Sequence, residues 1–233
     1  MEKLDLPKMS TIKPPKPKKS PESNEELPNI LDRCFDADYP SQKYVSDITY
    51  IWAENRWCYL CVIMDLFARK IIAYKISNKI DGELVRDTIR LAYLKRGCPS
   101  NVIFHMDRGS QYTAFDTRKL FDEYNWIESF SKKGCPYGNS VAEAFFKYLK
   151  CDEVYRRHYI TKEQMENSIF RIYQRSSQHT QKTFCHGYLS PNKKETLYWQ
   201  KLNSSENKVS HPKKQTAVGG APNSSLHYQT SIN

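Results

Sequence analysis

Residues 44–77 constrain the fold most, because they form three runs of strand-type sequence separated by short turns. The first run, 44–52, is rich in the β-branched and aromatic residues that strands favour. A turn at 53–56 leads into residues 57–67, which are apolar enough to be buried on both faces of a sheet. A second short turn leads to residues 70–77. The segment predicts an antiparallel meander whose middle strand lies inside the sheet.

Helix and strand patterns alternate after the meander. An amphipathic stretch begins at Asp81 and stops at Gly97, so its helix has a capping residue at one end and a glycine at the other. We expect strands at 101–106 and 127–130, helices at 115–124, about 140–154 and about 161–176, and an irregular loop at 131–139. This order predicts an α/β fold: a ribonuclease-H-like mixed sheet flanked by helices.

The two ends of the chain differ from this core in composition. Residues 1–28 are rich in lysine and proline and offer little to bury, so we expect a flexible arm. Residues 29–199 are expected to form the core with its C-terminal helices. Residues 200–233 are rich in serine, asparagine and lysine and are expected to be a disordered polar tail. No signal peptide or membrane-spanning run is apparent, which indicates a cytoplasmic protein without membrane contact.

Charge and cysteine content narrow the class of protein. The 233 residues are 39% hydrophobic, enough for one core of moderate size. The net charge is +10, with all of the positive excess behind residue 40, and it points to a polyanionic partner, most simply nucleic acid. Seven cysteines without framework spacing indicate a reduced chain. Cys58 and Cys61 fall three apart in a strand, where they face opposite sides and cannot share a zinc ion.

Three acids could work together in such a sheet. Asp47 lies in the first strand, Asp107 at the exit of the strand after the first helix, and Glu143 in the first turn of a helix. Two aspartates on neighbouring strands and a glutamate on a helix suit two divalent metal ions that act on a phosphodiester. Carboxylates are hard ligands, which Mg²⁺ prefers. Asp65 also follows a strand and is open to two interpretations, a fourth ligand or a turn residue paired with Arg69.

The helix that carries Glu143 allows two interpretations. The spacing from Ser140 to Glu143 is that of a capping box, in which the glutamate only closes the helix start. On a helical wheel, Asn139, Glu143, Lys147 and Lys150 fall on one polar stripe. That stripe suits either a phosphate backbone or plain solvent.

Four ordered blocks resemble a known family. They are Val-Ser-Asp-Ile-Thr-Tyr at 45–50, Asp-Leu-Phe-Ala-Arg-Lys-Ile at 65–71, His-Met-Asp-Arg-Gly-Ser-Gln-Tyr at 105–112, and Asn-Ser-Val-Ala-Glu-Ala-Phe-Phe-Lys at 139–147. They are similar to the bacterial transposases called insertion sequence three, whose second reading frame carries a retroviral-integrase-type core. The resemblance extends over roughly 27–191, including Gly-Tyr-Leu-Ser-Pro at 187–191.

The resemblance implies a function and a set of residues. The family's D,D,E triad falls on Asp47, Asp107 and Glu143, with 35 residues between the last two. It implies two Mg²⁺ ions, with Mn²⁺ as a substitute, cleavage of DNA by water at the element's ends, and attack of the freed 3′ hydroxyl on another phosphodiester. Partners would be element and target DNA and further copies of the chain on that DNA. We expect DNA contacts from Lys147, Lys150, Arg108, Lys132, Lys133 and Asn139.

The sequence departs from the family pattern in three places. Only the short Lys/Pro arm precedes the core, where the family has a helical DNA-binding region, so end recognition is expected to come from an upstream-frame protein or fusion, or to be lost. Residues 177–183 lack the usual Tyr-Asn-x-x-Arg-x-His pattern, and Gly138 stands where an aspartate is common. The alternative to an active transposase core is therefore a catalytically silent remnant that only binds nucleic acid. The 35-residue gap and a helix-borne glutamate disfavour a ribonuclease H proper.

Overall fold

The structure, a computed structural model, describes residues 27–132, 138–178 and 189–209, and the side chains of these residues as far as Ser205. The chain as far as Tyr198 forms one compact unit, and Trp199 begins a second. The first unit contains all the strands and helices that carry the predicted site. No helix among the described residues is long and apolar enough to cross a membrane.

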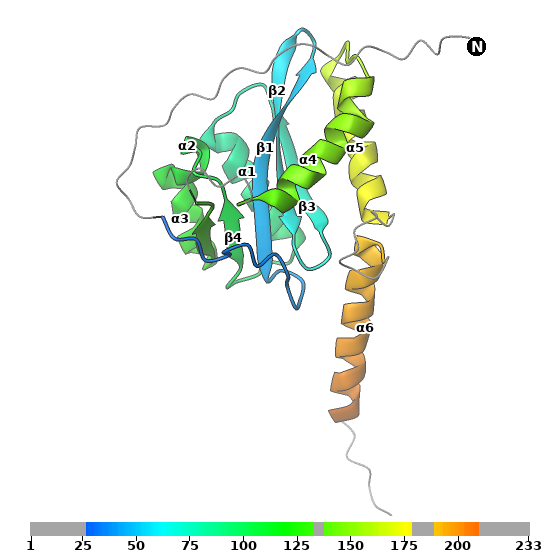
Figure 1. The fold of residues 1–233 in the computed structure, drawn as a ribbon. Coiled ribbons are helices and arrows are strands. Elements are labelled where there is room, and N and C mark those ends of the chain that lie inside the picture. The colour runs from blue at the N-terminus through cyan, green and yellow to red at the C-terminus, as the bar shows by residue number, and fades with distance from the viewer. Residues whose placement is uncertain (1–26, 133–137, 179–188, 210–233) are drawn as a thin grey trace, which may run out of the picture. The chain divides into compact units, whose positions relative to one another are not determined.

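A five-stranded mixed sheet lies at the centre of the first unit (Figure 1). Its spatial order is β3-β2-β1-β4-β5. The first three strands pair antiparallel, while β4 runs parallel to both β1 and β5. Their bounds are β1 Lys43–Ala53, β2 Arg56–Asp65, β3 Lys70–Ser77, β4 Ile103–Met106 and β5 Ile127–Phe130. The predicted meander and both later strands are confirmed.

The helices follow the predicted order with two additions, α2 and α6. α2 is a single turn that the sequence analysis missed, because a four-residue helix leaves no periodic pattern to detect. α6 was not predicted as a helix either. The bounds are α1 Gly82–Lys95, α2 Ser110–Thr113, α3 Phe115–Tyr124, α4 Ser140–Asp152, α5 Lys162–Gln178 and α6 Pro191–Val209, with a 3-10 turn at Val154–Arg156.

Local sequence explains where these elements start and stop. Glu54 and Asn55 both have positive φ, as a two-residue type I′ hairpin between β1 and β2 requires. The Asp81 side chain accepts a hydrogen bond from the Leu84 amide and so caps α1. Past the end of α1, Gly97 has φ +74, a left-handed conformation that glycine adopts without strain.

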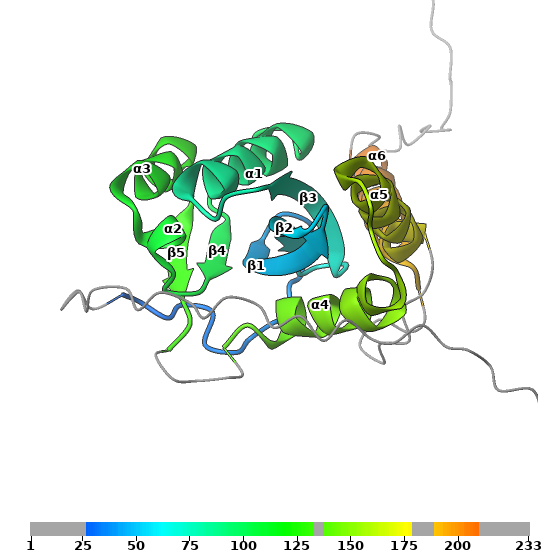
Figure 2. The same ribbon diagram turned by 90° about the horizontal axis from the view of Figure 1, so that it is seen from above.

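Helices cover both faces of the sheet (Figure 2). α1 and α3 pack on one face, and their core includes Val85, Ile89 and Phe121. α4 and α5 pack on the other face, where Phe145 and Ile169 contribute to a second core. The two faces of β2 belong to different cores, so its apolar sequence reflects burial on both sides. Cys58 and Cys61 accordingly lie in opposite cores, as predicted.

The ends of the core differ from the predicted boundaries. Leu27 is buried in the core of α1 and α3, and the Pro28 carbonyl accepts a hydrogen bond from the Phe130 amide, so the last two residues of the predicted arm belong to the fold. Residues 200–209, predicted to be disordered, continue α6. Neither glycine nor proline occurs between Pro191 and Val209, so nothing in the sequence stops that helix. Residues 1–26 and 210–233 lie outside the described residues.

Candidate active site

The strand register places Asp47 and Asp107 at equivalent positions. β1 and β4 run parallel, and their last paired residues are Val45 and His105. Each aspartate follows its paired residue by two positions, so both side chains leave the same face of the sheet at the same level. The sheet thus brings together two acids that are far apart in sequence.

α4 supplies Glu143 from a third segment. The helix is capped by Asn139, whose carbonyl accepts the Glu143 amide at 3.1 Å. Ser140 is already the first helical residue, so Ser140 and Glu143 do not occupy the two positions of a capping box, and that interpretation was wrong. The Glu143 side chain is exposed. It is therefore available to a ligand in the groove beside it.

A groove of about 390 Å³ lies between β1 and α4, and we call it the acidic groove. Asp47 and Glu143 line it from the two elements, together with Tyr50, Lys147 and Lys150. The two carboxylates could bind a metal cation, and the two lysines beside them could bind the phosphates of a nucleic-acid backbone.

The environment of Asp47 disfavours its charged form. Burial, followed by the neighbouring Asp107 and Glu143, raises the pKa of Asp47 to about 7, against the opposing effects of the Ile48 amide and Lys150. The Ile48 N–H donates to Asp47 Oδ1 at 2.7 Å. A bound cation would offset both the burial of this carboxylate and its repulsion by the other two acids.

Asp107 follows β4 directly and is close enough to Asp47 to raise the pKa of that residue. The residue is exposed, while surrounding protein atoms desolvate its carboxyl group and raise its pKa. The Gly109 N–H donates to Asp107 Oδ1 at 2.9 Å and fixes the carboxyl orientation. A Cβ on Gly109 would lie 2.9 Å from that same oxygen, so the turn needs glycine for close approach rather than for its φ.

Replacement of Asp47 by asparagine is expected to stabilise the metal-free protein at pH 8. A carboxyl group whose pKa is higher in the folded state than its usual 3.8 costs stability as the pH rises from about 4 to about 7. Asparagine keeps the acceptor for the Ile48 amide and removes the charge. Allowing for partial exposure, we expect a gain of about 2 kcal/mol, or roughly 4–8 °C in Tm, at pH 8 and little at pH 4. Thermal melting in EDTA at both pH values measures it, and an equal gain at the two pH values would contradict the charge argument.

Two of the residues predicted to contact DNA, Lys147 and Lys150, are among those that line the acidic groove. Lys147 is exposed and Lys150 half-buried, and both line the acidic groove. Arg108 instead donates hydrogen bonds to the backbone carbonyls of Ser131 and Leu27. Lys132 is exposed, within 3.6 Å of Asp32.

The last two residues of that set are Lys133 and Asn139. Lys133 lies outside the described residues. Asn139 is buried, with 6% of its surface exposed, and its amide donates to the Ser46 carbonyl at 2.9 Å. DNA contact by Asn139 stays a prediction, and its evident contribution is to tie α4 to β1.

Tyr50 belongs to the groove and was missed in the sequence analysis. Lys150 Nζ lies 5.7 Å from the centre of its ring, and Asp47 and Asp107 both contribute to the raised pKa of its hydroxyl, after burial. A tyrosine inside a strand pattern is more simply interpreted as core, and only its position beside α4 sets Tyr50 apart.

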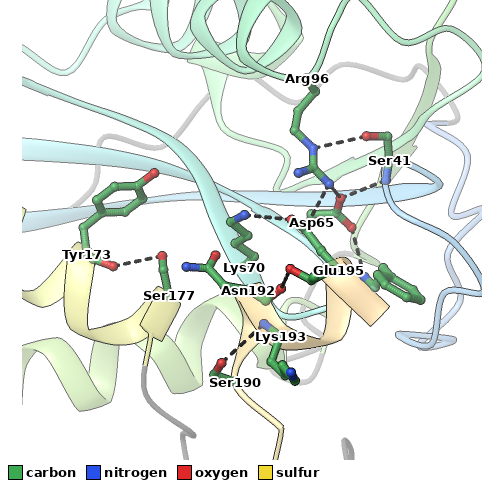
Figure 3. Close-up of polar contacts among 12 residues, drawn as sticks. Ser41, Asp65, Lys70, Arg96, Tyr173, Ser177, Ser190, Asn192, Lys193 and Glu195 are labelled. Atoms are coloured by element: carbon green, nitrogen blue, oxygen red, sulfur yellow. Dashed lines mark hydrogen bonds and ion pairs between the residues drawn. The ribbon is translucent and has the colours of Figure 1, made fainter. Parts of the chain in front are cut away.

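Asp65 is part of the framework and is not among the residues that line the acidic groove. It is fully buried, accepts the Phe67 amide at 3.0 Å, as a turn residue does, and forms an ion pair with Arg96 (Figure 3). The predicted turn role is confirmed, while its link to Arg69, which lies 3.9 Å from Asp36, stays a prediction. Arg96 reaches Asp65 from the end of α1, a contact that only the tertiary fold creates.

The chemistry of the groove fits a divalent cation. Asp47, Asp107 and Glu143 supply hard oxygen ligands, and Asn139 Oδ1 is buried with no hydrogen-bond donor among the described residues. Within the same part of the chain, no three His, Cys, Asp or Glu side chains are close enough to hold a metal ion together. Convergence of the three acids on shared metal ions therefore stays a prediction.

The sequence of the chain is similar to integrase cores and to bacterial transposases. The integrase core domain family matches residues 37–136. The transposase InsF for insertion sequence IS3A of Escherichia coli (strain K12) is 37% identical over 142 residues, which cover 61% of this chain and 49% of that protein. The transposase for insertion sequence element IS904 of Lactococcus lactis subsp. lactis (strain IL1403) is 33% identical over 144 residues, or 62% of this chain and 57% of that protein. The chain thus spans about half the length of these curated relatives.

Solved structures with the same fold are retroviral integrases. The HTLV-2 integrase catalytic core domain, in complex with magnesium, aligns with a TM-score of 0.51 and 12% identity over 67% of this chain and 97% of that one. The simian T-cell lymphotropic virus intasome aligns with a TM-score of 0.53 and 13% identity, over 95% of this chain and 68% of that one. At such low identity the comparison establishes the fold alone, a ribonuclease-H-like core.

Proposed function

We propose that this chain belongs to the insertion-sequence-three family of transposases and is the catalytic core of a DNA transposase, a D,D,E polynucleotidyl transferase. The integrase core domain family matches residues 37–136, and the InsF transposase is 37% identical over 142 residues. The observation that carries the proposal is the acidic groove. Asp47 of β1 and Glu143 of α4 line it, and Asp107, which directly follows β4, is near enough to raise the pKa of Asp47. No feature of the groove favours another reaction class.

The proposed reaction consists of two displacements at phosphorus. In the first, a water oxygen bonds to the phosphorus at an element end, and the departing 3′ oxygen leaves as a hydroxyl. In the second, that hydroxyl oxygen bonds to a target phosphorus and displaces another 3′ oxygen. The chain needs no covalent attachment to DNA for either step. Its contribution is to position the strand and to neutralise charge.

Asp47, Asp107 and Glu143 are the residues that would hold Mg²⁺, or Mn²⁺ in its place. Two such ions, when bound, supply activation of the attacking oxygen and stabilisation of the leaving oxygen. The Ile48 and Gly109 amides hold the two aspartates in fixed orientations. The exposed Glu143 side chain has the freedom to join them.

Lys147 and Lys150 would hold the phosphate backbone along α4. Each phosphate that a lysine neutralises releases counterions and contributes about −0.9 to the slope of log affinity against log salt. Replacing both lysines with alanine is expected to make that slope shallower by about 2. Fluorescence anisotropy with duplex DNA between 50 and 300 mM salt measures it.

A matched control for this experiment lies on the other face of the sheet. Lys119 is exposed on α3, so Lys119→Ala should leave the slope unchanged. An unaltered slope in the double variant would make the polar stripe of α4 an ordinary solvated face.

Nicking of DNA that carries the element's own ends tests the proposed function directly. We expect Mg²⁺-dependent cleavage, and stronger cleavage when the chain is joined to the product of the upstream reading frame. The alternative outcome is DNA binding with a steep salt dependence but no cleavage, either by the chain alone or by the joined protein. That outcome would indicate a silent remnant that only binds nucleic acid.

A further inference from the structure

His105 lies on β4, and its buried side chain contacts β5 and the residue that precedes the N-cap of α4. Only 1% of its surface is exposed. Its ring nitrogen Nδ1 lies 2.9 Å from Ser129 Oγ on β5, and Nε2 lies 2.9 Å from the Gly138 carbonyl oxygen. Neither proposed metal binding nor proposed DNA binding uses this side chain. Its hydrogen bonds nevertheless join the sheet to the segment from which α4 begins.

The chemistry of the partners requires a proton on Nε2. A carbonyl oxygen only accepts, so Nε2 must donate to Gly138. The Leu31 amide donates to Ser129 Oγ at 2.9 Å. The Ser129 oxygen has a second lone pair and a hydroxyl hydrogen, so it can either donate to His105 Nδ1 or accept from it. The bond from Nε2 to Gly138 therefore has a fixed direction, whereas the bond with Ser129 can run either way.

The Gly138 end of this chain is coupled to Glu143. Gly138 precedes Asn139, which caps α4, donates to the Ser46 carbonyl and accepts the Glu143 amide. The backbone of His105 pairs with Val45 in β1, two residues before both aspartates. One side chain therefore links the frame of Asp47 and Asp107 to the helix start that places Glu143.

We propose that His105 is a positioning residue that fixes the start of α4, and with it Glu143, against the strands that carry Asp47 and Asp107. The inference rests on the proposed function for its effect on catalysis. The positioning itself depends only on the hydrogen bonds, so it is testable without DNA or metal.

Two substitutions of His105 separate its two hydrogen bonds. Glutamine is long enough for its amide to reach the Gly138 carbonyl, whereas asparagine reaches only as far as Ser129. We expect His105→Asn to lower the single-turnover nicking rate on the order of 10–100-fold, with DNA affinity unchanged, because a displacement of about 1 Å in a catalytic group has such an effect. His105→Gln and Ser129→Ala should nick within a few-fold of wild type, although both lower the Tm. A nicking rate that falls in step with Tm across the three variants would instead assign His105 a purely structural role.

Two measurements on the metal-free protein complete the test. ¹⁵N NMR of the wild-type rings should show a proton on His105 Nε2, with exposed His158 as the reference within the same chain. Amide hydrogen exchange at Glu143 should speed up in His105→Asn and stay slow in His105→Gln. A ring without a proton on Nε2, or equal exchange in both variants, would overturn the inference even if nicking were normal. If wild type did not nick while the NMR and exchange results held, the proposed function would fail and the positioning would stand.

Discussion

Asp107→Asn is expected to abolish strand cleavage, with a loss of at least about 1000-fold in the nicking rate, while the fold and most of the DNA affinity are kept. The substitution is nearly isosteric, and the asparagine oxygen still accepts the Gly109 amide. What disappears is a ligand charge where two cations must be held against their mutual repulsion. Contacts of lysine with phosphates do not require that charge, so affinity should stay level or rise. Nicking assays in Mg²⁺ and in Mn²⁺ measure the loss.

The matched control for this variant is Asp116→Asn. Asp116 is exposed in the first turn of α3, so the same chemical change there should leave cleavage unaltered. Thermal melting confirms that both variants fold. A folded Asp107→Asn protein that cut as fast as Asp116→Asn would show that the acids of the groove are not the catalytic triad.

Arg96→Met is expected to be the most destabilising of these substitutions. The Arg96 guanidinium forms ion pairs with Asp65 and with Glu195, the latter at 2.8 Å (Figure 3). Asp65 has no exposed surface, and burial already raises its pKa against the opposing effect of Arg96. Removing one partner leaves a buried carboxylate without its counterion, which costs about 3–5 kcal/mol. We expect a fall in Tm of roughly 10 °C by calorimetry.

Arg90→Met is the control on the same helix. Arg90 pairs with Asp87 at 3.1 Å, and both side chains are about half exposed, so its loss should cost less than about 0.5 kcal/mol. Adding Asp65→Asn to Arg96→Met should restore part of the Tm, because the buried carboxylate is then gone and Glu195 keeps Lys70 as its partner at 2.7 Å. Similar melting of the two arginine variants would mean that the ion-pair network contributes little to stability.

The strands and helices could be predicted from sequence because their signals are local. β-branched and aromatic runs, the positive-φ pair Glu54 and Asn55, and the Asp81 cap all act within a few residues. The position of Glu143 on a helix could be predicted from local sequence as well. The capping-box interpretation was wrong, because the helix starts one residue earlier than that pattern requires and Asn139 occupies the N-cap position.

The contacts between elements could not be predicted in this way. Asp65 pairs with Arg96 because the end of α1 returns to the end of β2 only after the sheet has formed. Tyr50 and Lys150 meet for the same reason, across β1 and α4. A pair of residues 31 or 100 positions apart leaves no periodic mark on the sequence. Such pairs were therefore missed.

The sequence by itself determined the α/β order of elements, the resemblance to insertion-sequence transposases and the three acids proposed for catalysis, because each depends on residue type and spacing. Only the tertiary structure decided that Asp47 and Asp107 share a level of the sheet, that Lys147 and Lys150 line one groove with Asp47, and that His105 joins that sheet to α4. The physical reason is that register, burial and hydrogen-bond direction belong to pairs of segments, and packing alone brings those segments together.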